Sequence, residues 1–339
     1  MLHSWNKFFP GKNAAALVIA LWLTAILSLA ALGLAYHTRM AINDAVLERE
    51  RLRALYLCKA MVARAALAIE QDTNPWNARS ESWCAHLDFA EEGWLDEMGL
   101  SDEEKSDVKC EYAVWDESGK INVNVAGNPD LYYLNTLQPT QASAILDWVS
   151  PAGVARPGGA QSDYYEQLTP PYAAKNAPIQ ALEELLSVKG ITPDLFLGTP
   201  DHSTGLDAPY SVGMREDLTV YGDGLININT AAPEVIAAIS PYLSEATVSY
   251  IAQCVRGPDG VLGTSDDVPF TDLSELAGVP GISDLELAIL TAACTVKSSV
   301  FSILCRVTVG DGKAKKTVHA VIARDAVTGH VQTIAWREY

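Results

Sequence analysis

Three closely spaced acidic residues offer the most specific chemistry in this sequence. The stretch 257–267 reads GPDGVLGTSDD and places Asp259, Asp266 and Asp267 in one glycine-bearing turn. Carboxylate oxygens at short spacing in a loop are the ligands that Ca²⁺ prefers. The Asp-x-Asp-x-Asp-Gly order and the final Glu of an EF-hand are missing. We predict a calcium site at these three residues, and the alternative is a solvated acidic turn.

The residue types that serve catalysis do not have the spacing that catalysis needs. The six histidines form no His-Glu-x-x-His pair, and the sequence has no Gly-x-Ser-x-Gly turn and no phosphate-binding loop. Glu183 and Glu184 are adjacent, but such a pair is typical of a solvated helix face. We predict that the protein is not an enzyme, because the nucleophile motifs of a membrane-tethered hydrolase are missing.

Six cysteines raise the question of metal or disulfide chemistry. They form no Cys-x-x-Cys pair, so a zinc ribbon is not predicted. If the body of the protein lies in an oxidising compartment, disulfides are allowed. The pairs that fall within one predicted domain are Cys84 with Cys110 and Cys254 with Cys294. Buried thiols are the alternative.

Two similar phrases, about a hundred residues apart, indicate an internal repeat. ESGKINVNVAGNPDLYYL occupies 117–134 and GDGLININTAAPEVIAAI occupies 222–239, and each unit later has a Gly-Ile hairpin. Asparagine bonds its own backbone in turns, so each Ile-Asn-x-Asn predicts an extended entry and a turn. Thr230 is expected to cap the helix that Pro233 begins. We predict two related helical units, of helix-hairpin-helix or SAM-like type, at about 119–198 and 222–297, with a linker near 198–224.

Helix-hairpin-helix units often bind DNA, but the charge of this chain argues against that function. The formal net charge is −18, and all 42 acidic residues lie from Asp44 onward. Nucleic-acid affinity comes largely from Lys and Arg that neutralise phosphates. Neither hairpin has the second Gly of Gly-Ile-Gly, and Pro280 has no amide hydrogen. We predict no nucleic-acid partner. The alternative is a membrane-anchored helix-hairpin-helix protein that binds or takes up DNA.

The N-terminal segment predicts one long helix that begins in a membrane. The 23 residues from Ala14 to Tyr36 carry no charge, and roughly 20 apolar residues span a bilayer as a helix. Lys7 and Lys12 precede this run, which predicts a cytoplasmic N-terminus. Residues 37–71 contain no Gly or Pro, so the helix is expected to continue to Gln71. An apolar stripe recurs every seven residues along it, at Met40, Leu47, Ala54, Met61 and Ala68.

Alternating β-rich runs flank the helical region. VKCEYAVWDESGK at 108–120 reads as a strand and a turn, and three more β-rich runs follow Val296. The turns between these runs contain Gly310, Gly312 and Gly329. We predict that the four strands form an antiparallel sheet against the long helix, with 119–297 inserted between the first strand and the others.

The start of the chain resembles type IV prepilin-like proteins, which have a basic leader, a cleavage site and then an apolar helix. Aligning the onset of the apolar run places the cut between Ala14 and Ala15, and the alternative is between Gly11 and Lys12. Most pilins and pseudopilins have Glu as the fifth mature residue, where this chain has Ile19. Loss of that Glu is a mark of the K-type minor pseudopilins of type II secretion.

The stretch DYYEQLTPPYAAKNAPIQALEELLSVKGITPDLFLG, at 163–198, is similar to the same family in its order of motifs. The resemblance implies an α+β pilin-like fold, in which a long, partly transmembrane helix packs on an antiparallel sheet that carries a large helical insert. It also implies calcium binding in the insert. The expected parts are a leader (1–14), a transmembrane segment (15–36), the first part of the pilin-like body (37–118), the inserted domain (119–297) and the C-terminal strands (298–339).

Membership of this family implies a role in assembly. Such a subunit would cap the tip of the pseudopilus and start its assembly, for export of folded proteins across the outer membrane. The implied partners are the I- and J-type minor pseudopilins, the major pseudopilin, prepilin peptidase, the inner-membrane secretion platform and exported substrate. The implied location is the bacterial inner membrane, crossed once, with a cytoplasmic N-terminus and a periplasmic body.

Overall fold

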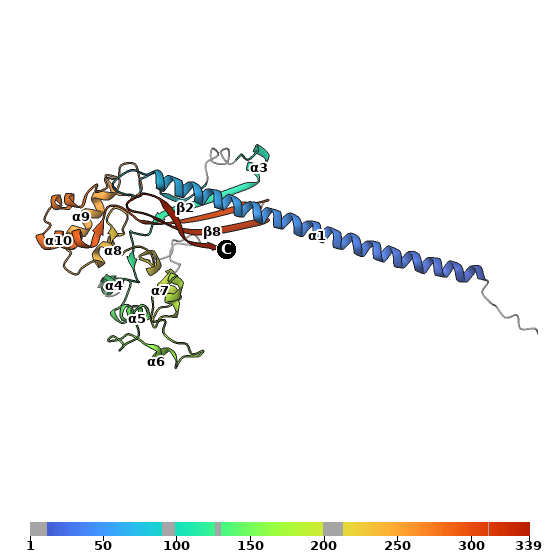
Figure 1. The fold of residues 1–339 in the computed structure, drawn as a ribbon, viewed down its shortest axis with the longest axis horizontal. Helices are drawn as coiled ribbons and strands as arrows, with labels where there is room; N and C mark the ends of the chain where they lie inside the picture. Colours follow the sequence, from blue (N-terminus) through green and yellow to red (C-terminus); the bar gives the residue numbers. More distant parts are fainter. Residues whose placement is uncertain (1–11, 90–98, 126–129, 199–212, 311) are drawn as a thin grey trace, which may run out of the picture.

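The fold is organised around one helix of 60 residues. The computed structural model describes residues 12–89, 99–125, 130–198, 213–310 and 312–339. Helix α1 (Lys12–Gln71) is continuous, and its N-terminal half extends away from the rest of the molecule (Figure 1). The predicted helix from Ala14 to Gln71 is therefore confirmed, because a run without Pro keeps every backbone hydrogen bond of the helix intact.

A five-stranded antiparallel sheet lies against the C-terminal half of α1 (Figure 1). The strands, in sheet order, are β1 (Ala85–Phe89), β2 (Val108–Asp116), β7 (Val300–Val309), β8 (Ala314–Arg324) and β9 (Val331–Glu338). A short helix, α3 (Asp102–Ser106), precedes β2. The sheet predicted from the sequence is confirmed, and β1 is an edge strand that the sequence did not reveal.

The apolar stripe of α1 explains how the helix packs on the sheet. Ala54 and Met61 are buried against β7 and β8, whereas Met40, in the same stripe, is exposed. The small side chains of Ala54, Cys58 and Ala65 let the helix lie close to the strands. The stripe thus has two parts, one that packs on the sheet and one that does not.

The insert between β2 and β7 consists of two units with the same plan. The first contains β3 (Ile121–Asn122), α4 (Asp130–Tyr133), α5 (Pro139–Val149), α6 (Ser162–Tyr165), η1 (Leu182–Ser187), α7 (Pro193–Leu197), η2 (Met214–Glu216) and β4 (Leu218–Thr219). The second contains β5 (Ile226–Asn227), α8 (Pro233–Ala238), α9 (Glu245–Arg256), η3 (Leu273–Gly278), α10 (Asp284–Ala293) and β6 (Cys294–Thr295). In each unit the first and last strands pair in parallel. One apolar core, separate from that of the sheet, runs through both units.

The two Ile-Asn-x-Asn phrases have the same hydrogen bonds. In each, the Oδ1 of the first Asn accepts a bond from the backbone N–H of the second, at 2.9 Å in the first unit and 3.0 Å in the second. The second Asn, Asn124 or Asn229, then bonds both backbone groups of one distant residue, Ile179 or Phe270. The predicted turn is confirmed, and the side-chain amides also fix the segment that leads into the 3₁₀ helix of each unit.

Two details differ from the expectations. The N-cap of α8 is Ala232, and Thr230 instead donates its hydroxyl to Asp116 of strand β2 at 2.6 Å. The first unit also does not end near residue 198, because β4 closes it at Leu218–Thr219. The hairpin glycines, Gly190 and Gly281, both have φ of 80°. That conformation is the reason for Gly at these positions.

Glu286 joins two helix N-termini in the second unit. Its carboxylate accepts bonds from the backbone N–H groups of Ser244 and Ser283 and from the hydroxyls of Ser283 and Thr247. These hydrogen bonds, first that from the Ser244 backbone, hold the pKa of Glu286 far below its usual range. A lowered pKa means that the carboxylate stabilises the fold above about pH 4 and that this stabilisation is lost as the pH falls further.

We expect Glu286→Gln to lower the free energy of unfolding by about 2 kcal/mol at pH 7, because an amide cannot accept all four bonds. The difference from the parent should shrink toward pH 3. Urea denaturation at both pH values measures it. Glu245→Gln, at an exposed position in the first turn of α9, is the matched control and should change the stability by less than about 0.5 kcal/mol. A deficit that stays constant with pH would contradict the explanation.

Candidate functional site

The exposed half of α1 is the first candidate surface. In the described part of the chain it is the one helix that is long and apolar enough to cross a membrane. Its large apolar side chains between Leu17 and Tyr36 are 54–70% exposed, including Ile19 at 60%. Apolar side chains at such exposure in one continuous helix require lipid or other protein around them.

The predicted cleavage sites lie at the start of this helix. Ala14 and Ala15 are consecutive residues of α1, and Lys12 is its first residue. Gly11, the residue before the alternative cut, lies outside the described residues. The helix runs through both Ala14 and Ala15 without a break, so the choice between the two sites stays a prediction.

The apolar surface of α1 continues beyond the predicted membrane span. Exposed apolar side chains recur along the helix at Met40, Ile42, Val46, Leu52, Tyr56 and Leu67. Leu52, Tyr56 and Leu67 lie on the side of the helix opposite the buried residues Ala54 and Met61, whereas Met40 lies in the same stripe as these two but before the part of α1 that packs on the sheet. A second helix that ran alongside α1 would therefore meet apolar side chains well above the membrane.

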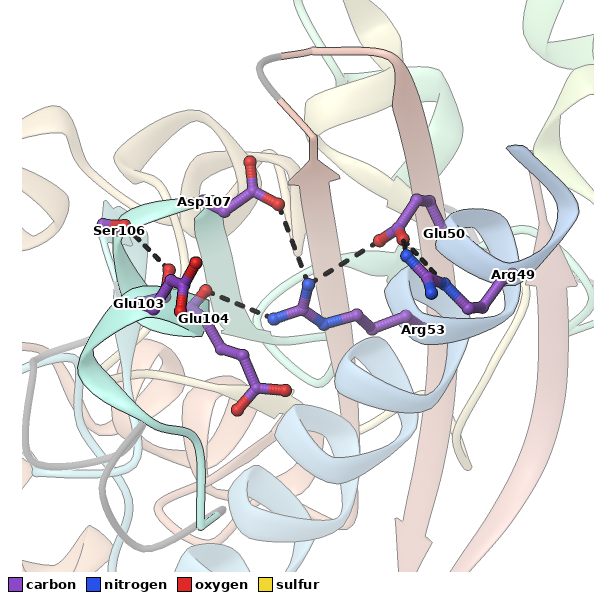
Figure 2. Close-up of a pocket in the computed structure, with 7 residues that line it drawn as sticks. All are labelled: Arg49, Glu50, Arg53, Glu103, Glu104, Ser106 and Asp107. Carbon is purple, nitrogen blue, oxygen red and sulfur yellow. Dashed lines mark hydrogen bonds and ion pairs between the residues drawn. The ribbon is translucent and has the colours of Figure 1, made fainter. Parts of the chain in front are cut away.

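A polar pocket lies beside this surface, between α1 and α3 (Figure 2). Its volume is about 670 Å³, and its lining is Arg49, Glu50, Arg53, Glu103, Glu104, Ser106 and Asp107. Arg53 lies between two carboxylates, 3.6 Å from Glu50 Oε2 and 3.7 Å from Asp107 Oδ2. Glu50 is buried, and its Oε2 accepts no hydrogen bond in the described structure. The lining has two guanidinium groups and four carboxylates, so the pocket keeps a net negative charge, and its ion pairs join α1 to the segment around α3.

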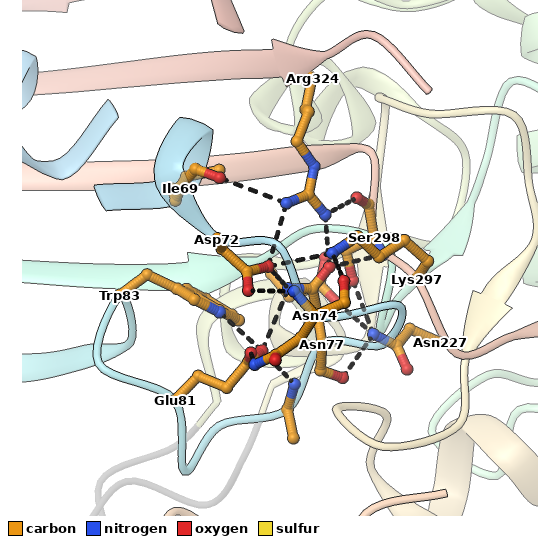
Figure 3. Close-up of polar contacts among 12 residues, drawn as sticks. Ile69, Asp72, Asn74, Asn77, Glu81, Trp83, Asn227, Lys297, Ser298 and Arg324 are labelled. Carbon is orange, nitrogen blue, oxygen red and sulfur yellow. Dashed lines mark hydrogen bonds and ion pairs between the residues drawn. The ribbon is translucent and has the colours of Figure 1, made fainter. Parts of the chain in front are cut away.

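A buried polar junction connects the body to the insert (Figure 3). We define the polar junction as Asp72, Asn77, Asp116, Asn227, Ser298 and Arg324. Asn227, fully buried, donates from Nδ2 to Asn77 O, Asp116 Oδ2 and Ser298 Oγ, at 3.1, 3.2 and 2.6 Å. Burial raises the pKa of Asp116, although hydrogen bonds from Ser298 and Thr230 oppose that effect. The first Asn of the second repeat thus links the insert to β2 and to the segment after α1.

Arg324 supplies the positive charge of the polar junction. It lies at the end of β8 and is 7% exposed. Its guanidinium donates to Ile69 O, Asp72 Oδ2, Asn77 Oδ1 and Ser298 O. It also lies over the ring of Phe301, 5.3 Å from the centroid. One feature of the sequence could have revealed that Arg324 is buried. Every second residue of β8 lies on the face that is turned toward the helix, and this set is Val318, Ala320, Ile322 and Arg324.

A serine, a histidine and a glutamate meet in the sheet, a combination that can be catalytic. Ser302 Oγ donates to Glu117 Oε1 at 2.6 Å and lies 3.3 Å from His319 Nε2. Ser302 is fully buried, and its proton goes to the glutamate and not to the histidine. Burial lowers the pKa of His319, which stacks on Trp115. A nucleophile must reach its substrate, so this contact is structural.

The acidic loop brings together two of its three predicted ligands. Thr264 Oγ1 lies 2.6 Å from Asp266 Oδ1 and 3.4 Å from Asp267 Oδ1. The carboxylate of Asp259 instead accepts a hydrogen bond from the backbone N–H of Val261. The backbone N–H of Asp259 donates to the carboxylate of Asp266. Within the ranges described above, no group of three His, Cys, Asp or Glu side chains is arranged to hold a metal ion. The carboxylate oxygens accept hydrogen bonds from within the loop and hold it closed.

Neither predicted disulfide is present, and all six cysteines are thiols. Cys84 Sγ lies 3.4 Å from the carbonyl oxygen of Val114 on β2. Cys110 lies four residues earlier on the same strand, about 13 Å away, which is too far for a bond. In the other pair, Cys254 is hydrogen-bonded to Tyr250 of its own helix, while Cys294 is buried in β6. The register of the strands thus contradicts the pair Cys84 with Cys110, whereas the pair Cys254 with Cys294 stays a prediction.

The fold defines a class of protein in which a long, partly apolar helix packs on an antiparallel sheet and a helical insert lies between the strands. It is similar to a chain in the crystal structure of the GspK-GspI-GspJ complex from the enterotoxigenic Escherichia coli type 2 secretion system. The TM-score is 0.61 with 14% identity, and the match covers 86% of this chain and 98% of that chain.

Residues 130–198, within the first unit, match the family model described as type II secretion system (T2SS), protein K. A type II secretion system protein K from Aeromonas hydrophila is 28% identical over 179 residues. That match covers 51% of this chain and 46% of the relative, so it spans about half the length of the curated protein. The resemblance to protein K of type II secretion is confirmed by these findings.

Proposed function

We propose that this chain is a minor pseudopilin of a type II secretion system, a structural subunit without catalytic activity. The observation that carries the proposal is the continuous helix α1. Its N-terminal half is apolar and exposed, and its C-terminal half packs on an antiparallel sheet. The match of residues 130–198 to the family model of T2SS protein K supports the assignment of this pseudopilin to the K type.

The position of the insert supports a role at the filament tip. The second unit lies at the end of the body away from the exposed half of α1, and the first unit lies below the sheet in the view of Figure 1, where it contacts Arg337 of β9. A pilin-like filament grows by packing helices side by side, with each body above the membrane half of its own helix. A body enlarged on the far side leaves no room for a further subunit there, so this chain would cap the pseudopilus and start its assembly.

The proposed location follows from α1. Residues 15–36 would cross the bacterial inner membrane once, with the N-terminus in the cytoplasm and the body in the periplasm. Prepilin peptidase would remove the leader between Ala14 and Ala15 or between Gly11 and Lys12. The proposed partners are the I- and J-type minor pseudopilins, the major pseudopilin, the secretion platform and exported substrate. The similar structure is a complex of GspK with GspI and GspJ, which supports the first two.

Co-purification from membranes tests this proposal. The full chain, expressed with the I- and J-type pseudopilins of its own organism, should retain both after detergent extraction. We expect Ile42→Asp with Val46→Asp to lose them, because both side chains are exposed apolar residues of α1 above the predicted span. Val154→Asp, at a 96% exposed position in the insert, is the control and should retain them. Failure of the parent chain to retain either partner would count against the proposal.

Mass spectrometry of the mature N-terminus tests the processing step. A chain that starts at Ala15 or Lys12 supports a pseudopilin, and an intact Met1 or a cut after about residue 35 contradicts it.

We further propose that the two units of the insert are helix-hairpin-helix-like units that serve packing and not DNA binding. At the two hairpins, the backbone N–H groups of Ile191 and Ile282 donate to the carbonyl oxygens of Val188 and Val279, so they are already bonded within the protein. DNA binding or uptake stays the alternative function. A gel shift at low salt separates the two, because duplex binding in the micromolar range would favour the alternative.

Calcium at the acidic loop also stays a proposal. Asp266 and Asp267 would supply the carboxylates that bind it, since their side chains already meet at Thr264. We expect calcium, and not magnesium, to raise the melting temperature of the parent by a few degrees. Asp266→Asn with Asp267→Asn should abolish that shift, whereas Asp272→Asn, the exposed N-cap of η3, should keep it. An equal shift in all three proteins would exclude this loop as the site.

A further inference from the structure

Three of the six cysteines lie in one layer between α1 and the sheet. Cys58 comes from α1, Cys110 from β2 and Cys305 from β7, and all three are buried in the core of the body. The thiols are far apart in the sequence, and 247 positions separate Cys58 from Cys305. Only the packing of the helix on the sheet brings them together.

Cys58 and Cys305 face each other where α1 packs on β7. Cys58 Sγ lies 4.0 Å from the carbonyl oxygen of Cys305 and 3.7 Å from that of Lys316, so the helix is close to the strands at this level. Both side chains are fully buried. Cys305 Sγ has a further sulfur neighbour, Met61 Sδ, at 3.4 Å.

The third cysteine has no comparable partner among these thiols. Cys110 is opposite Val307 in the sheet, and Cys305 is opposite Tyr112. Cys110 and Cys305 are therefore diagonal neighbours on adjacent strands, about 7 Å apart, whereas the Cβ atoms of a disulfide are about 4 Å apart.

We propose that Cys58 and Cys305 form a disulfide when the body is exported, and that this bond pins α1 to β7. The compartment rests on the proposed function, because a periplasmic body is exposed to disulfide oxidants and a cytoplasmic one is kept reduced. The geometry does not rest on it. The bond would join the helix that is anchored in the membrane to the central strand of the sheet.

The chemistry is thiol–disulfide exchange with a disulfide-bonded oxidoreductase of the exporting compartment. One protein thiolate attacks a sulfur of the oxidant and forms a mixed disulfide. The second protein thiolate then attacks the protein sulfur of that mixed disulfide and releases the oxidant as a dithiol. Two protein thiols lose two protons and two electrons, and the oxidant gains them. Since both thiols are fully buried in the folded body, the exchange takes place during folding, before α1 closes over β7.

The bond has a mechanical consequence for a subunit of this shape. The exposed half of α1 has no contact with the sheet, so a force that draws the helix out of the membrane acts on the body only through residues 47–71. A covalent bond at Cys58 transmits that force to β7, in the middle of the order β1-β2-β7-β8-β9. Without it, only apolar packing and noncovalent bonds, such as that from Arg324 to Ile69 O, resist separation of the helix from the sheet.

Peptide mapping of the exported full chain tests the proposal. The thiols are alkylated in denaturant without reductant and the chain is digested with trypsin. Cys58, Cys305 and Cys110 then lie in separate peptides, 54–59, 298–306 and 110–120. We expect peptide 54–59 joined to 298–306, and their recovery as separate alkylated peptides overturns the proposal. A link from either of them to 110–120 also overturns it.

Variants and a refolding experiment separate this inference from the proposed function. Cys58→Ser and Cys305→Ser should lose the link, and Cys110→Ser should keep it. Reductant should lower the melting temperature of the parent by about 5 °C and leave that of Cys58→Ser unchanged. Purified chain refolded with oxidised glutathione should form the same link. If it does so while the exported chain stays reduced, the proposal that the bond forms on export is overturned, and the fault lies in the periplasmic location and not in the pairing. If neither forms it, the pairing is wrong, whatever partners co-purify.

Discussion

Replacing Arg324 with methionine is expected to lower the free energy of unfolding by about 3–5 kcal/mol. The guanidinium donates to four acceptors from three segments, and methionine leaves all of them without that donor. Asp72 would keep one cation, since Lys297 Nζ lies 3.0 Å from its Oδ2. The acceptors Asn77 Oδ1 and Ser298 O are buried, so water does not readily replace the lost bonds. Urea denaturation followed by tryptophan fluorescence measures the loss, because Trp83 packs on Phe301 beneath Arg324.

Arg337 provides the matched control on the next strand. Its guanidinium pairs with Glu183 at 3.4 Å, and both side chains are partly exposed. Arg337→Met should therefore cost no more than about 1 kcal/mol. Equal losses for the two variants would show that Arg324 contributes only as an apolar stem and not through its hydrogen bonds.

The second large effect is expected for Asn227→Asp, with a loss of about 4 kcal/mol at pH 7. Asn227 Nδ2 donates to Asp116 Oδ2, and a carboxylate at this position would place two like charges side by side in a buried site. The bonds to Asn77 O and Ser298 Oγ would be weakened as well. Because Asn227 joins the insert to the body, losing its hydrogen bonds should separate the insert from the body before the core of either part unfolds.

The pH dependence of this variant gives a second measurement. Burial already raises the pKa of Asp116, and a second carboxyl beside it would have its own pKa raised by burial and by that charge. Raised pKa values mean that the folded state binds more protons than the unfolded chain, so the penalty is full above the folded pKa and disappears as the pH falls toward about 4. Asn135→Asp, at an exposed position, is the control and should show neither the loss nor the pH dependence. A penalty independent of pH would falsify the like-charge explanation.

Local patterns gave the elements of this fold and their order. A long run of helix formers without Pro specifies α1, and alternation with glycine turns specifies β7, β8 and β9. Thr192 and Ser283 each cap the following helix, as their positions before helix-forming runs indicate. The repeat in the insert was also visible, because Asn bonds within two residues of itself in both copies. All of these interactions act over a few residues.

The candidate sites were harder to predict, because their members come from distant segments. The polar junction brings together residues 72, 116, 227, 298 and 324, and nothing in the local sequence of Asp116 distinguishes it from an exposed acid. Thr230 has the position of a helix cap, yet a buried carboxylate on β2 competes for its hydroxyl and binds it. The acidic loop was visible as a cluster of charges, but its internal hydrogen bonds were not.

The sequence by itself determined that this protein has an apolar helix long enough to cross a membrane, a sheet made from strands on both sides of an insert, and a repeat within that insert. These properties follow from periodicity, which each segment carries alone. Only the tertiary structure decided which thiols meet, which carboxylates are buried and which amide joins the insert to the body. Those outcomes depend on strand register and on how closely α1 approaches the sheet, and both are fixed by the packing of the whole core.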